Sequence, residues 1–585
     1  MSQQETKDMA TYFYRASAAD FMKIPGSPVA YWLSKNAVNT FTGKKLFDIG
    51  ITRRGLQTGE KDRFIRYWHE CNLCSTETNL LSRAEAVKSQ KRWFLFNNGG
   101  DFRKWYGNLD LVVNWERNGR DLKNFPGSII PSEAIYFQEG ICWPRLGSGV
   151  AGFRLHPTGY IPGDLSPCFY SETDNLSVMG LLNSKLSYYF LSAINPTVTT
   201  PVGDLGKIPF KEHERLSEAK EKVSTLIELH KVDWRNFETA IDFDKPTLIR
   251  SSNQQSKLQS IYQHCRSGWH EATLETQSLE EDNNKLFIEV YDLQRELSPV
   301  VPLEDITLIC NPHYRYGSNR SEGELETLLQ CDTLRELVSY AIGCMMGRYS
   351  LDKLGLVLAS QGETLQDYLR KIPSPRFAPD DDAILPLTDQ EWFNDDATNR
   401  FREFVRVVWG DEHLQQNLDF VAESLCLHAI KPKRGESALD TIRRYLSTQF
   451  YKDHLRTYKK RPIYWLFSSG KHKAFECLVY LHRYNEGTLA RMRTEYVIPL
   501  SAKLNAYAEK LEQDKEASTS AAENKRLEKE IATLHKQQAE LAEFDEKLRH
   551  YADQRISLDL DDGVKVNYGK FGDLLAEVKA VTGQK

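Results

Sequence analysis

The chain has 585 residues, of which 41% are hydrophobic and 27% are charged, the proportions of an ordinary globular protein. This length exceeds what a single hydrophobic core organises, so we expect three or four domains. No apolar run approaches the roughly 18 residues of a membrane span, and the N-terminus lacks the pattern of a secretory signal. The ten cysteines are scattered, which favours free thiols and a cytoplasmic location.

The formal net charge of −5 does not by itself favour a nucleic-acid-binding protein. The charge is unevenly distributed, however. Residues 1–215 contain 26 Lys+Arg and 21 Asp+Glu, a balance of +5, so the remaining residues carry −10. Within that acidic remainder, residues 428–473 hold twelve Lys+Arg against three Asp+Glu. The sequence therefore contains two basic zones that are candidates for contact with nucleic acid.

Residues 1–215 are rich in glycine, proline and aromatic residues, and their apolar runs are short, as in WFLFNN and DLVVNW. Short strands separated by loops give this texture, so we predict a β-rich domain over 1–215. Apolar residues recur at spacings of three and four over 177–193, which predicts a helix near the end of this domain.

From residue 216 onward we predict a mostly α-helical chain. Four stretches have the apolar spacing of helices, the third of them as a buried helix followed by a turn: 216–234, 283–297, 333–359 and 401–425. We divide this part of the chain into a helical bundle or linker over 216–310, a helical domain over 311–494 that contains the basic zone, a hairpin, and a tail over 551–585.

The hairpin is predicted over 495–550 from two runs of apolar residues with coiled-coil spacing. They are Val497, Leu500, Leu504, Tyr507 and Leu511, then Leu527, Ile531, Leu534, Leu541 and Leu548, with polar Gln538 and Asp545 at seam positions. The small, polar segment DKEASTSAAENK separates the runs, so we expect an antiparallel coiled-coil hairpin, with one continuous helix as the alternative. The predicted fold is thus α+β and multidomain.

The motifs of an amino-group methyltransferase are missing from this sequence. Such an enzyme needs a glycine-rich turn for S-adenosylmethionine and a (D/N/S)-P-P-(Y/F) loop that holds the flipped base. The only G-x-G, Gly147-Ser148-Gly149, has no helical pattern after it and is interpreted as a turn. Asn311-Pro312-His313-Tyr314 departs from the second motif at one position and is interpreted as a structural turn, with a degenerate methyl-donor site as the alternative.

The sequence also gives little support for a metal site or for the active site of a hydrolase. His69 and Cys71-x-x-Cys74 suggest zinc, but a closed structural site needs four ligands and no second C-x-x-C is present. The sequence also lacks a P-loop, H-E-x-x-H and G-x-S-x-G. We expect neither a metal nor a catalytic residue in this chain.

Several stretches resemble known DNA-modifying enzymes. Residues 47–68, with their Gly-Leu-Gln-Thr-Gly turn, and residues 180–210 are similar to the target-recognition domains of type IIG restriction–modification enzymes. Five further segments resemble the PglX family, the adenine-specific DNA methyltransferases of BREX phage-defence systems: 23–34, 96–125, 338–356, 458–485 and 560–571. The segments follow the order of that family's C-terminal half and extend over nearly the whole chain.

The resemblance implies target recognition for adenine-N6 methylation, with the catalytic half that binds S-adenosylmethionine absent from this chain. We therefore expect no cofactor here and no activity from this chain alone. The implied partners are double-stranded DNA and a methyltransferase catalytic domain or chain. Other phage-defence proteins, or a phage inhibitor that mimics DNA, are further candidate partners. The alternative function is a protein-interaction scaffold that docks such partners.

The turn from Arg53 to Gly59 is the first candidate DNA contact. Arginine can bond guanine and glutamine can bond adenine in the major groove, and glycines let a backbone approach phosphate closely. The candidate residues are Arg53, Arg54, Gln57, Thr58, Lys61 and Arg63, followed by Arg66. The alternative is a surface hairpin with solvated charges.

A second candidate is the loop 97–107, which mixes amides, aromatics and the cations Arg103 and Lys104. It suits groove contact and equally a packed turn with Trp105 and Tyr106 in the core. Residues 143–145 and 154–156 are interpreted as edges of core strands.

A third candidate is the basic zone, where cations alternate with tyrosines over 431–473. The candidate residues are Arg443, Arg444, Lys459, Lys460 and Arg461. This composition suits contact with a DNA backbone, a displaced strand or an acidic protein. A solvated basic helix face is the alternative.

Overall fold

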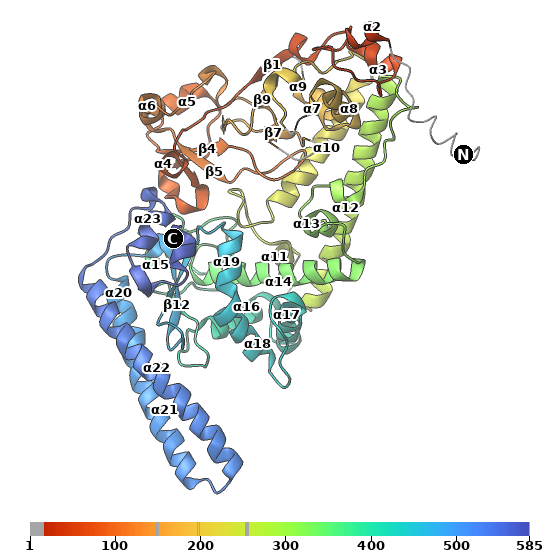
Figure 1. The fold of residues 1–585 in the computed structure, drawn as a ribbon. Coiled ribbons are helices and arrows are strands. Elements are labelled where there is room, and N and C mark those ends of the chain that lie inside the picture. The colour runs from red at the N-terminus through yellow and green to blue at the C-terminus, as the bar shows by residue number, and fades with distance from the viewer. Residues whose placement is uncertain are drawn as a thin grey trace. The chain divides into compact units, whose positions relative to one another are not determined.

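The computed structural model describes residues 17–146, 151–172, 174–195, 197, 199–251 and 257–583. The Gly147-Ser148-Gly149 turn lies outside the described residues. The fold is α+β and multidomain, as predicted (Figure 1). Among the described residues, each helix is too short or too polar to span a lipid bilayer.

Two compact units divide the chain. Unit 1 comprises Met1–Ile65, Thr76–Trp234 and Gly268–Asn319, and unit 2 comprises Arg66–Ser75, Arg235–Ser267 and Arg320–Lys585. The boundaries that we predicted at residues 215 and 310 do not coincide with these divisions. One reason is that α10 (Leu216–Trp234) packs on α7 (Asn175–Asn183), so a helix beyond residue 215 completes the β-rich unit.

The first sheet of unit 1 has four antiparallel strands in the order β1-β9-β6-β7. The strands are β1 (Gly50–Arg53), β9 (Cys168–Ser171), β6 (Gly140–Cys142) and β7 (Arg154–His156). Buried and exposed residues alternate along β1, because one face of this edge strand meets solvent. Its last residue, Arg53, lies opposite Cys168.

The second sheet of unit 1 is built around β4 (Trp93–Asn97), all five residues of which are buried. β5 (Leu111–Asn114) pairs with it antiparallel, and β3 (Thr76–Glu77) and β8 (Ile161–Pro162) pair with it in parallel. The apolar runs WFLFNN and DLVVNW thus form strands, as predicted. β2 (Ile65–Tyr67) spans the division between the units.

The helix predicted over 177–193 is two helices, α7 and α8 (Lys185–Ile194). Ser184 adopts an extended conformation between them and its hydroxyl donates to the carbonyl of Leu181. The predicted helix 216–234 is α10. The one predicted over 283–297 belongs to a longer helix, α12 (Leu258–Val290), which ends just before Asp292 takes a positive φ of 55°.

Short helices complete unit 1. They are α2 (Ala18–Phe21), α3 (Lys35–Thr40), α4 (Lys61–Phe64), α5 (Arg83–Lys88), α6 (Glu116–Asn124), α9 (Val202–Leu205) and α13 (Pro312–Tyr316), with single 3-10 turns at Leu46–Asp48, Glu133–Ile135 and Leu303–Asp305.

In unit 2, α14 (Glu322–Met345) packs against α16 (Ala397–Trp409) and α17 (Leu414–His428). The predicted helix and turn over 333–359 correspond to the second half of α14 and the irregular chain after it. The amphipathic block 401–425 is divided between α16 and α17, because Gly410 ends α16 with a φ of 80°. α18 (Ala438–Tyr445) continues through a π-helical turn, Leu446–Phe450, into α19 (Tyr451–Thr457).

A small antiparallel sheet, β10-β12-β11, lies in the part of the chain that we predicted to be helical. Its strands are β10 (Ile384–Pro386), β11 (Tyr464–Ser468) and β12 (Glu476–Tyr480). The remaining short helices of unit 2 are α11 (Thr247–Arg250), α15 (Leu365–Lys371), α20 (Thr488–Arg491), α23 (Val564–Gly569) and α24 (Val578–Thr582). A π-helical turn lies at Met492–Val497, and 3-10 turns lie at Trp68–Glu70, Leu73–Ser75, Leu481–Arg483, Leu560–Asp562 and Gly572–Leu574.

The helical hairpin is confirmed. α21 (Ile498–Ala517) turns back at residues 518–520 into α22 (Ala521–Asp553), and the two helices lie side by side (Figure 1, blue). The predicted seam leucines are buried between them. Polar seam positions have partners: Gln538 donates to Asn505 at 2.8 Å, and Asp545 accepts from Arg493 at 2.7 Å. The turn excludes one continuous helix.

The core of unit 2 contains a fully buried arginine, Arg348. Its Nε donates to the hydroxyl of Tyr349 at 3.1 Å, and one Nη donates to the hydroxyl of Tyr480 at 3.0 Å. The guanidinium also lies 5.3 Å from the ring of Trp68. The buried side chain of Glu238 accepts a hydrogen bond from Tyr458 at 2.9 Å. Burial raises the pKa of Glu238, and the positive charge of Arg348 offsets part of that rise. Aromatic side chains thus surround Arg348 and the nearby carboxyl group of Glu238 inside unit 2.

Candidate nucleic-acid interface

The turn after β1 is held in place by backbone hydrogen bonds on both sides. The amide of Leu56 donates to Pro162 at 2.7 Å, and the carbonyl of Leu56 accepts from Asp164 at 3.0 Å. Gln57 exchanges two backbone hydrogen bonds with Ile129, of 3.0 and 2.9 Å. The recognition turn, as we call residues 53–59, is therefore a fixed part of unit 1 that presents its side chains from a rigid backbone.

The two glycines of the recognition turn serve packing against protein rather than the approach to phosphate that we predicted. A Cβ on Gly55 would lie 2.2 Å from the carbonyl oxygen of Pro162. Gly59 has a φ of +75°, and a Cβ there would lie 2.3 Å from the carbonyl oxygen of Gly127. Both positions therefore require glycine because neighbouring backbone fills the space.

An ion cluster stands beside the turn. Asp164 accepts from Arg54 at 2.9 and 2.6 Å through one oxygen and from Arg145 at 2.7 Å through the other. The side chains of both arginines stay partly exposed, at 46% and 38%. One carboxylate shared by two guanidiniums leaves a net positive charge, and it fixes both arginines in position. We had interpreted Arg145 as the edge of a core strand, but its side chain is 38% exposed and belongs to this cluster. Asp164 was not in our predicted set, since it is distant in sequence from Arg54.

The other predicted side chains of this turn differ in accessibility. Arg53 is exposed, and among the described residues its side chain meets only the neighbouring carbonyl of Thr52, at 3.0 Å. Gln57 is half-buried, whereas Thr58 is buried and its carbonyl accepts from Ser128. A buried Thr58 cannot reach a base without rearrangement, so we omit it from the surface that we propose.

The short helix α4 presents two further cations. Lys61 and Arg63 are both exposed. The guanidinium of Arg63 lies 4.9 Å from the ring of Phe64 and 5.3 Å from that of Phe125, and 3.8 Å from the carboxylate of Glu60. These contacts orient Arg63 while leaving it accessible to a phosphate.

The loop 97–107 is a packed turn, one of the two interpretations that we considered. Arg103 and Lys104 are buried, and the Lys104 ammonium is paired with Glu280. Glu280 also accepts from the indole of Trp105 at 2.7 Å. Arg103 donates to the carbonyl of Thr307 at 3.1 Å. Both cations are buried and engaged by internal partners, which removes them from the proposed DNA surface.

The strand β7 is buried as we expected for a core strand. Arg154 and His156 are both fully buried. Arg154 donates to the carbonyl of Gly99 at 3.2 Å, and His156 meets the amide of Asn97 at 3.1 Å. Burial lowers the pKa of His156 to about 4, so it is neutral at physiological pH. These residues stabilise the loop 97–107 from inside.

The basic zone of unit 2 contains fewer available cations than its composition suggests. Arg443 is bonded to Asp396 at 2.6 Å and Arg444 to Glu436 at 2.5 Å, and all four side chains are largely buried. Arg461 is mostly buried, 3.8 Å from Glu70. We therefore omit these three arginines from the proposed surface.

Nine of the twelve lysines and arginines over 428–473 are exposed, and five of them lie at two places in the chain. Lys459 lies 5.4 Å from the ring of Tyr67, and Lys460 follows it, both with positive φ. Lys431, Lys433 and Arg434 lie in the loop between α17 and α18, and within the described part of the chain their side chains form no ion pair or hydrogen bond. These three were not singled out in our prediction.

The near-match to a catalytic loop has a structural role. Asn311 is buried and caps α13: its oxygen accepts from the amide of His313 at 3.1 Å, and its amide donates to Leu303 and Ile306 at 2.7 and 2.8 Å. Every polar atom of this side chain is thus occupied. Tyr314 donates its hydroxyl to the carbonyl of Phe102 at 2.5 Å. These residues thus have a structural role, at the start of a short helix rather than in the turn that we predicted.

The cysteine pair has protein partners as well. The thiol of Cys71 donates to the carbonyl of Tyr67 at 3.8 Å, and that of Cys74 lies 2.9 Å from the hydroxyl of Ser360. Within the described residues, no group of three or more His, Cys, Asp or Glu side chains is arranged to hold a metal ion.

Comparison with known proteins found two relatives. The chain is 45% identical over 571 residues to the adenine-specific methyltransferase BrxX of Escherichia coli O9:H4 (strain HS), and the match covers 96% of this chain and 46% of that protein. It is 35% identical over 586 residues to the adenine-specific methyltransferase PglX of Lacticaseibacillus casei (strain Zhang), covering 96% and 45%. No family model matches the chain. The chain spans about half the length of these curated relatives, and both matches support a place in the BrxX/PglX family.

Proposed function

We propose that this relative of BrxX and PglX recognises a short sequence in double-stranded DNA and thereby directs adenine-N6 methylation in cytoplasmic phage defence. The matches extend over 96% of the chain, and both relatives are named adenine-specific methyltransferases. We further propose that the chain corresponds to the C-terminal half of such a protein, and that a catalytic domain or chain supplies the methyl donor site.

S-adenosylmethionine does not fit the residues of this chain. The sequence has no glycine-rich turn between a strand and a helix of the kind that holds this donor. Asn311, in the nearest match to a target-base loop, has all its hydrogen-bonding atoms occupied by the protein's own backbone. We therefore assign recognition, and no step of methyl transfer, to this chain.

The recognition turn carries the proposal. Arg53 is exposed, Arg54 is fixed by Asp164, and half-buried Gln57 lies on a backbone anchored from two sides. Arginine and glutamine are the side chains that read guanine and adenine edges, and a rigid support makes such reading selective. Lys61 and Arg63 on α4 are placed to contact phosphates.

The test is selection of bound duplexes from a pool with a randomised central segment, using the full 585-residue chain at low salt. We expect one short motif to be enriched and the variant Arg53→Gln to lose part of the enrichment. Binding without enrichment of any motif would contradict sequence recognition.

A second candidate function is docking of other defence proteins, or of a phage inhibitor, on the helical hairpin. Beyond the contacts at its base, such as Glu540 with Ser469 at 2.7 Å, the described residues of α21 and α22 bury their apolar side chains only along the mutual seam. Their polar outer faces are available to a partner. Deletion of residues 495–550 should abolish co-purification with such a partner, and unchanged assembly would exclude this function.

A further inference from the structure

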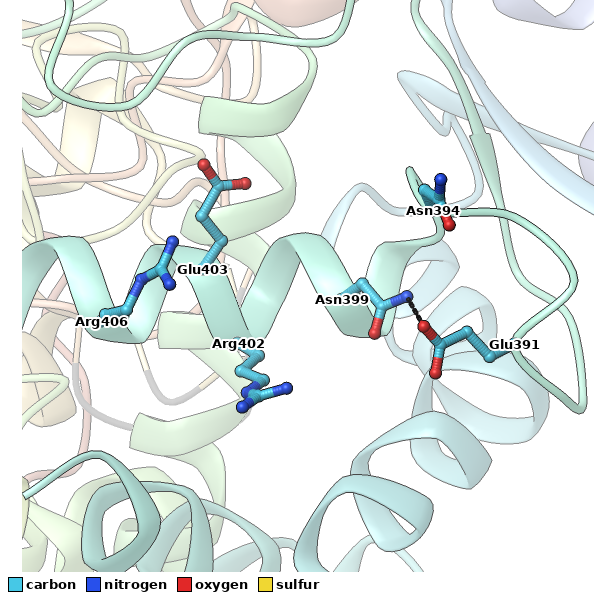
Figure 2. Close-up of a pocket in the computed structure, with 6 residues that line it drawn as sticks. All are labelled: Glu391, Asn394, Asn399, Arg402, Glu403 and Arg406. Carbon is cyan, nitrogen blue, oxygen red and sulfur yellow. Dashed lines mark hydrogen bonds between the residues drawn. The ribbon is translucent and has the colours of Figure 1, made fainter. Parts of the chain in front are cut away.

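A polar hollow of 330 Å³ lies beside α16 in unit 2 (Figure 2). Six side chains line it: Glu391, Asn394, Asn399, Arg402, Glu403 and Arg406. Three come from the segment leading into α16 and its first turn, and three from the next turns of the same helix. None is aromatic or aliphatic, so the hollow suits a hydrophilic ligand rather than an apolar one.

The two arginines of the hollow lie on the solvent-facing side of the amphipathic helix α16. The inner face of this helix is buried through Phe401, Phe404, Val405 and Val408. Arg402 and Arg406 fall on the outer face, four residues apart, and both are exposed. Residues at this spacing have Cβ atoms roughly 5–6 Å apart on one helix face. Their guanidiniums can therefore act together on one extended ligand.

Neither arginine has a side-chain partner among the residues that the structure describes. Within the described part of the chain, the side chains of Arg402 and Arg406 take part in no hydrogen bond or ion pair. Other arginines near α16 are engaged: Arg443 with Asp396, and Arg400 with Glu403. Two unpaired guanidiniums in one hollow are free to bind an anion bidentately.

The carboxylates of the hollow limit what this anion can be. Glu403 is paired with Arg400, which compensates its charge. Glu391 accepts from the amide of Asn399 at 3.0 Å, drawn in Figure 2, and keeps its negative charge. A ligand that fits the hollow therefore places negative charge beside Arg402 and Arg406. Near Glu391 and Asn399 it presents groups that can form hydrogen bonds. A sugar–phosphate backbone has this character.

We propose that this hollow holds the backbone of a nucleic-acid strand, with Arg402 and Arg406 on successive phosphates. The inference rests on the proposed function and adds a second, sequence-independent contact in unit 2. Without an aromatic platform the hollow cannot stack bases, so it contributes affinity and no base preference.

One arginine of the basic zone, Arg443, holds the first turn of α16 in place instead of contacting nucleic acid itself. Asp396 caps the first turn of α16 by accepting from the amide of Asn399 at 2.8 Å, and the same carboxylate accepts from Arg443 at 2.6 Å. Arg443 is thus a positioning residue for α16. α16 also packs with α17 and α18, whose connecting loop carries the exposed Lys431, Lys433 and Arg434.

The test measures binding of the full chain to a selected duplex and to its scrambled counterpart over a series of salt concentrations. In Arg402→Gln/Arg406→Gln, affinity for both duplexes should fall by the same factor, and the slope of log K against log salt should shrink by roughly 1.8, about 0.9 for each lost phosphate. Glu391→Gln should strengthen binding to both. Arg549→Gln on α22, an exposed cation without a side-chain partner among the described residues, is the matched control and should leave the slope unchanged.

The outcomes separate this inference from the proposed function. Unchanged affinity and slope in the double variant, with sequence preference intact, would overturn the hollow alone. A changed ratio between selected and scrambled duplexes would overturn its sequence independence. Arginine-dependent binding without any preference would support the hollow and contradict recognition. Polyglutamate, added as a model of an acidic protein, tests the remaining possibility. If the chain binds polyglutamate and no DNA, both the proposed nucleic-acid site in the hollow and the proposed DNA recognition are wrong. Circular dichroism checks that each variant is folded.

Discussion

At the scale of single residues, burial decides which cations can meet DNA. Lys104 and Arg103 appear in the sequence as part of a basic, glycine-rich loop, yet both are buried against partners from distant parts of unit 1. Glu280 lies 176 residues from Lys104 in the chain. Local composition carries no information about such a pairing. Arg53 is exposed because it lies on the solvated face of the edge strand β1, and Gln57 in the turn after it is half-buried. Their contact with DNA stays a prediction.

Replacing the buried Arg348 tests its hydrogen bonds in the core of unit 2. Arg348→Met keeps much of the side-chain volume but removes the guanidinium that donates to the buried hydroxyls of Tyr349 and Tyr480. We expect the free energy of unfolding to fall by roughly 1–3 kcal/mol, the usual cost of leaving a buried polar group without its hydrogen-bond partner. Chemical denaturation measures this change. Arg370→Met, at a side chain that is 76% exposed, is the control and should stay within about 0.5 kcal/mol of the parent chain.

Glu238 should make stability depend on pH. Burial raises the pKa of Glu238 to about 7, above the roughly 4.3 of an unfolded chain. The folded protein then holds this proton more tightly, so stability is lost as pH rises from about 4.5 to about 7 and is level above that range. Relative to Glu238→Gln, the parent chain should lose roughly 3 kcal/mol across this window. Denaturation curves of both proteins at several pH values measure the difference, and parallel profiles would disprove the assignment.

At the scale of elements, sequence periodicity predicted the helices that pack on one face and left completely buried strands ambiguous. α10 and the α21–α22 hairpin were predicted because their apolar residues recur with helical spacing. A short, fully apolar run can be a buried strand or a buried helix segment, and only its surroundings favour one. β4 was predicted because it lies in a glycine- and proline-rich region, whereas the equally buried strands of the sheet β10-β12-β11 lie among helical patterns and were missed. The single helix predicted over 177–193 failed at Ser184, whose extended conformation leaves no trace in the apolar pattern.

The recognition turn should tolerate no side chain at Gly55. The Cβ of Gly55→Ala would collide with the backbone of Pro162, so we expect a loss of roughly 1–3 kcal/mol in the free energy of unfolding, together with weaker sequence preference. Gly268→Ala is a matched control, since α12 leaves open space there. That change should stabilise the protein by about 0.5–1 kcal/mol, the helix preference of alanine over glycine. Equal stability of both variants would refute the role given to Gly55.

At the scale of the whole molecule, the composition of the two units could not be predicted from the sequence. A resemblance over nearly the whole chain pointed to the BrxX/PglX family, and the two relatives support it. The units, however, interleave along the chain, with Arg66–Ser75 belonging to unit 2 between two segments of unit 1. Contacts of this kind arise from tertiary packing, so linear boundaries such as 215 and 310 cannot describe them. Target reading is proposed for unit 1, and backbone contact for unit 2.

The central claim is that this chain prefers one DNA sequence through its recognition turn. Its most direct test is the ratio of dissociation constants of the full chain for a selected duplex and a scrambled one, compared at one fixed salt concentration. We expect a preference of roughly tenfold or more, which is about 1.4 kcal/mol or more. Arg53→Gln should lose roughly 1 kcal/mol or more of this preference, and Arg549→Gln should keep all of it. A ratio of one in the parent chain, or the same ratio in Arg53→Gln as in the parent, would contradict the claim.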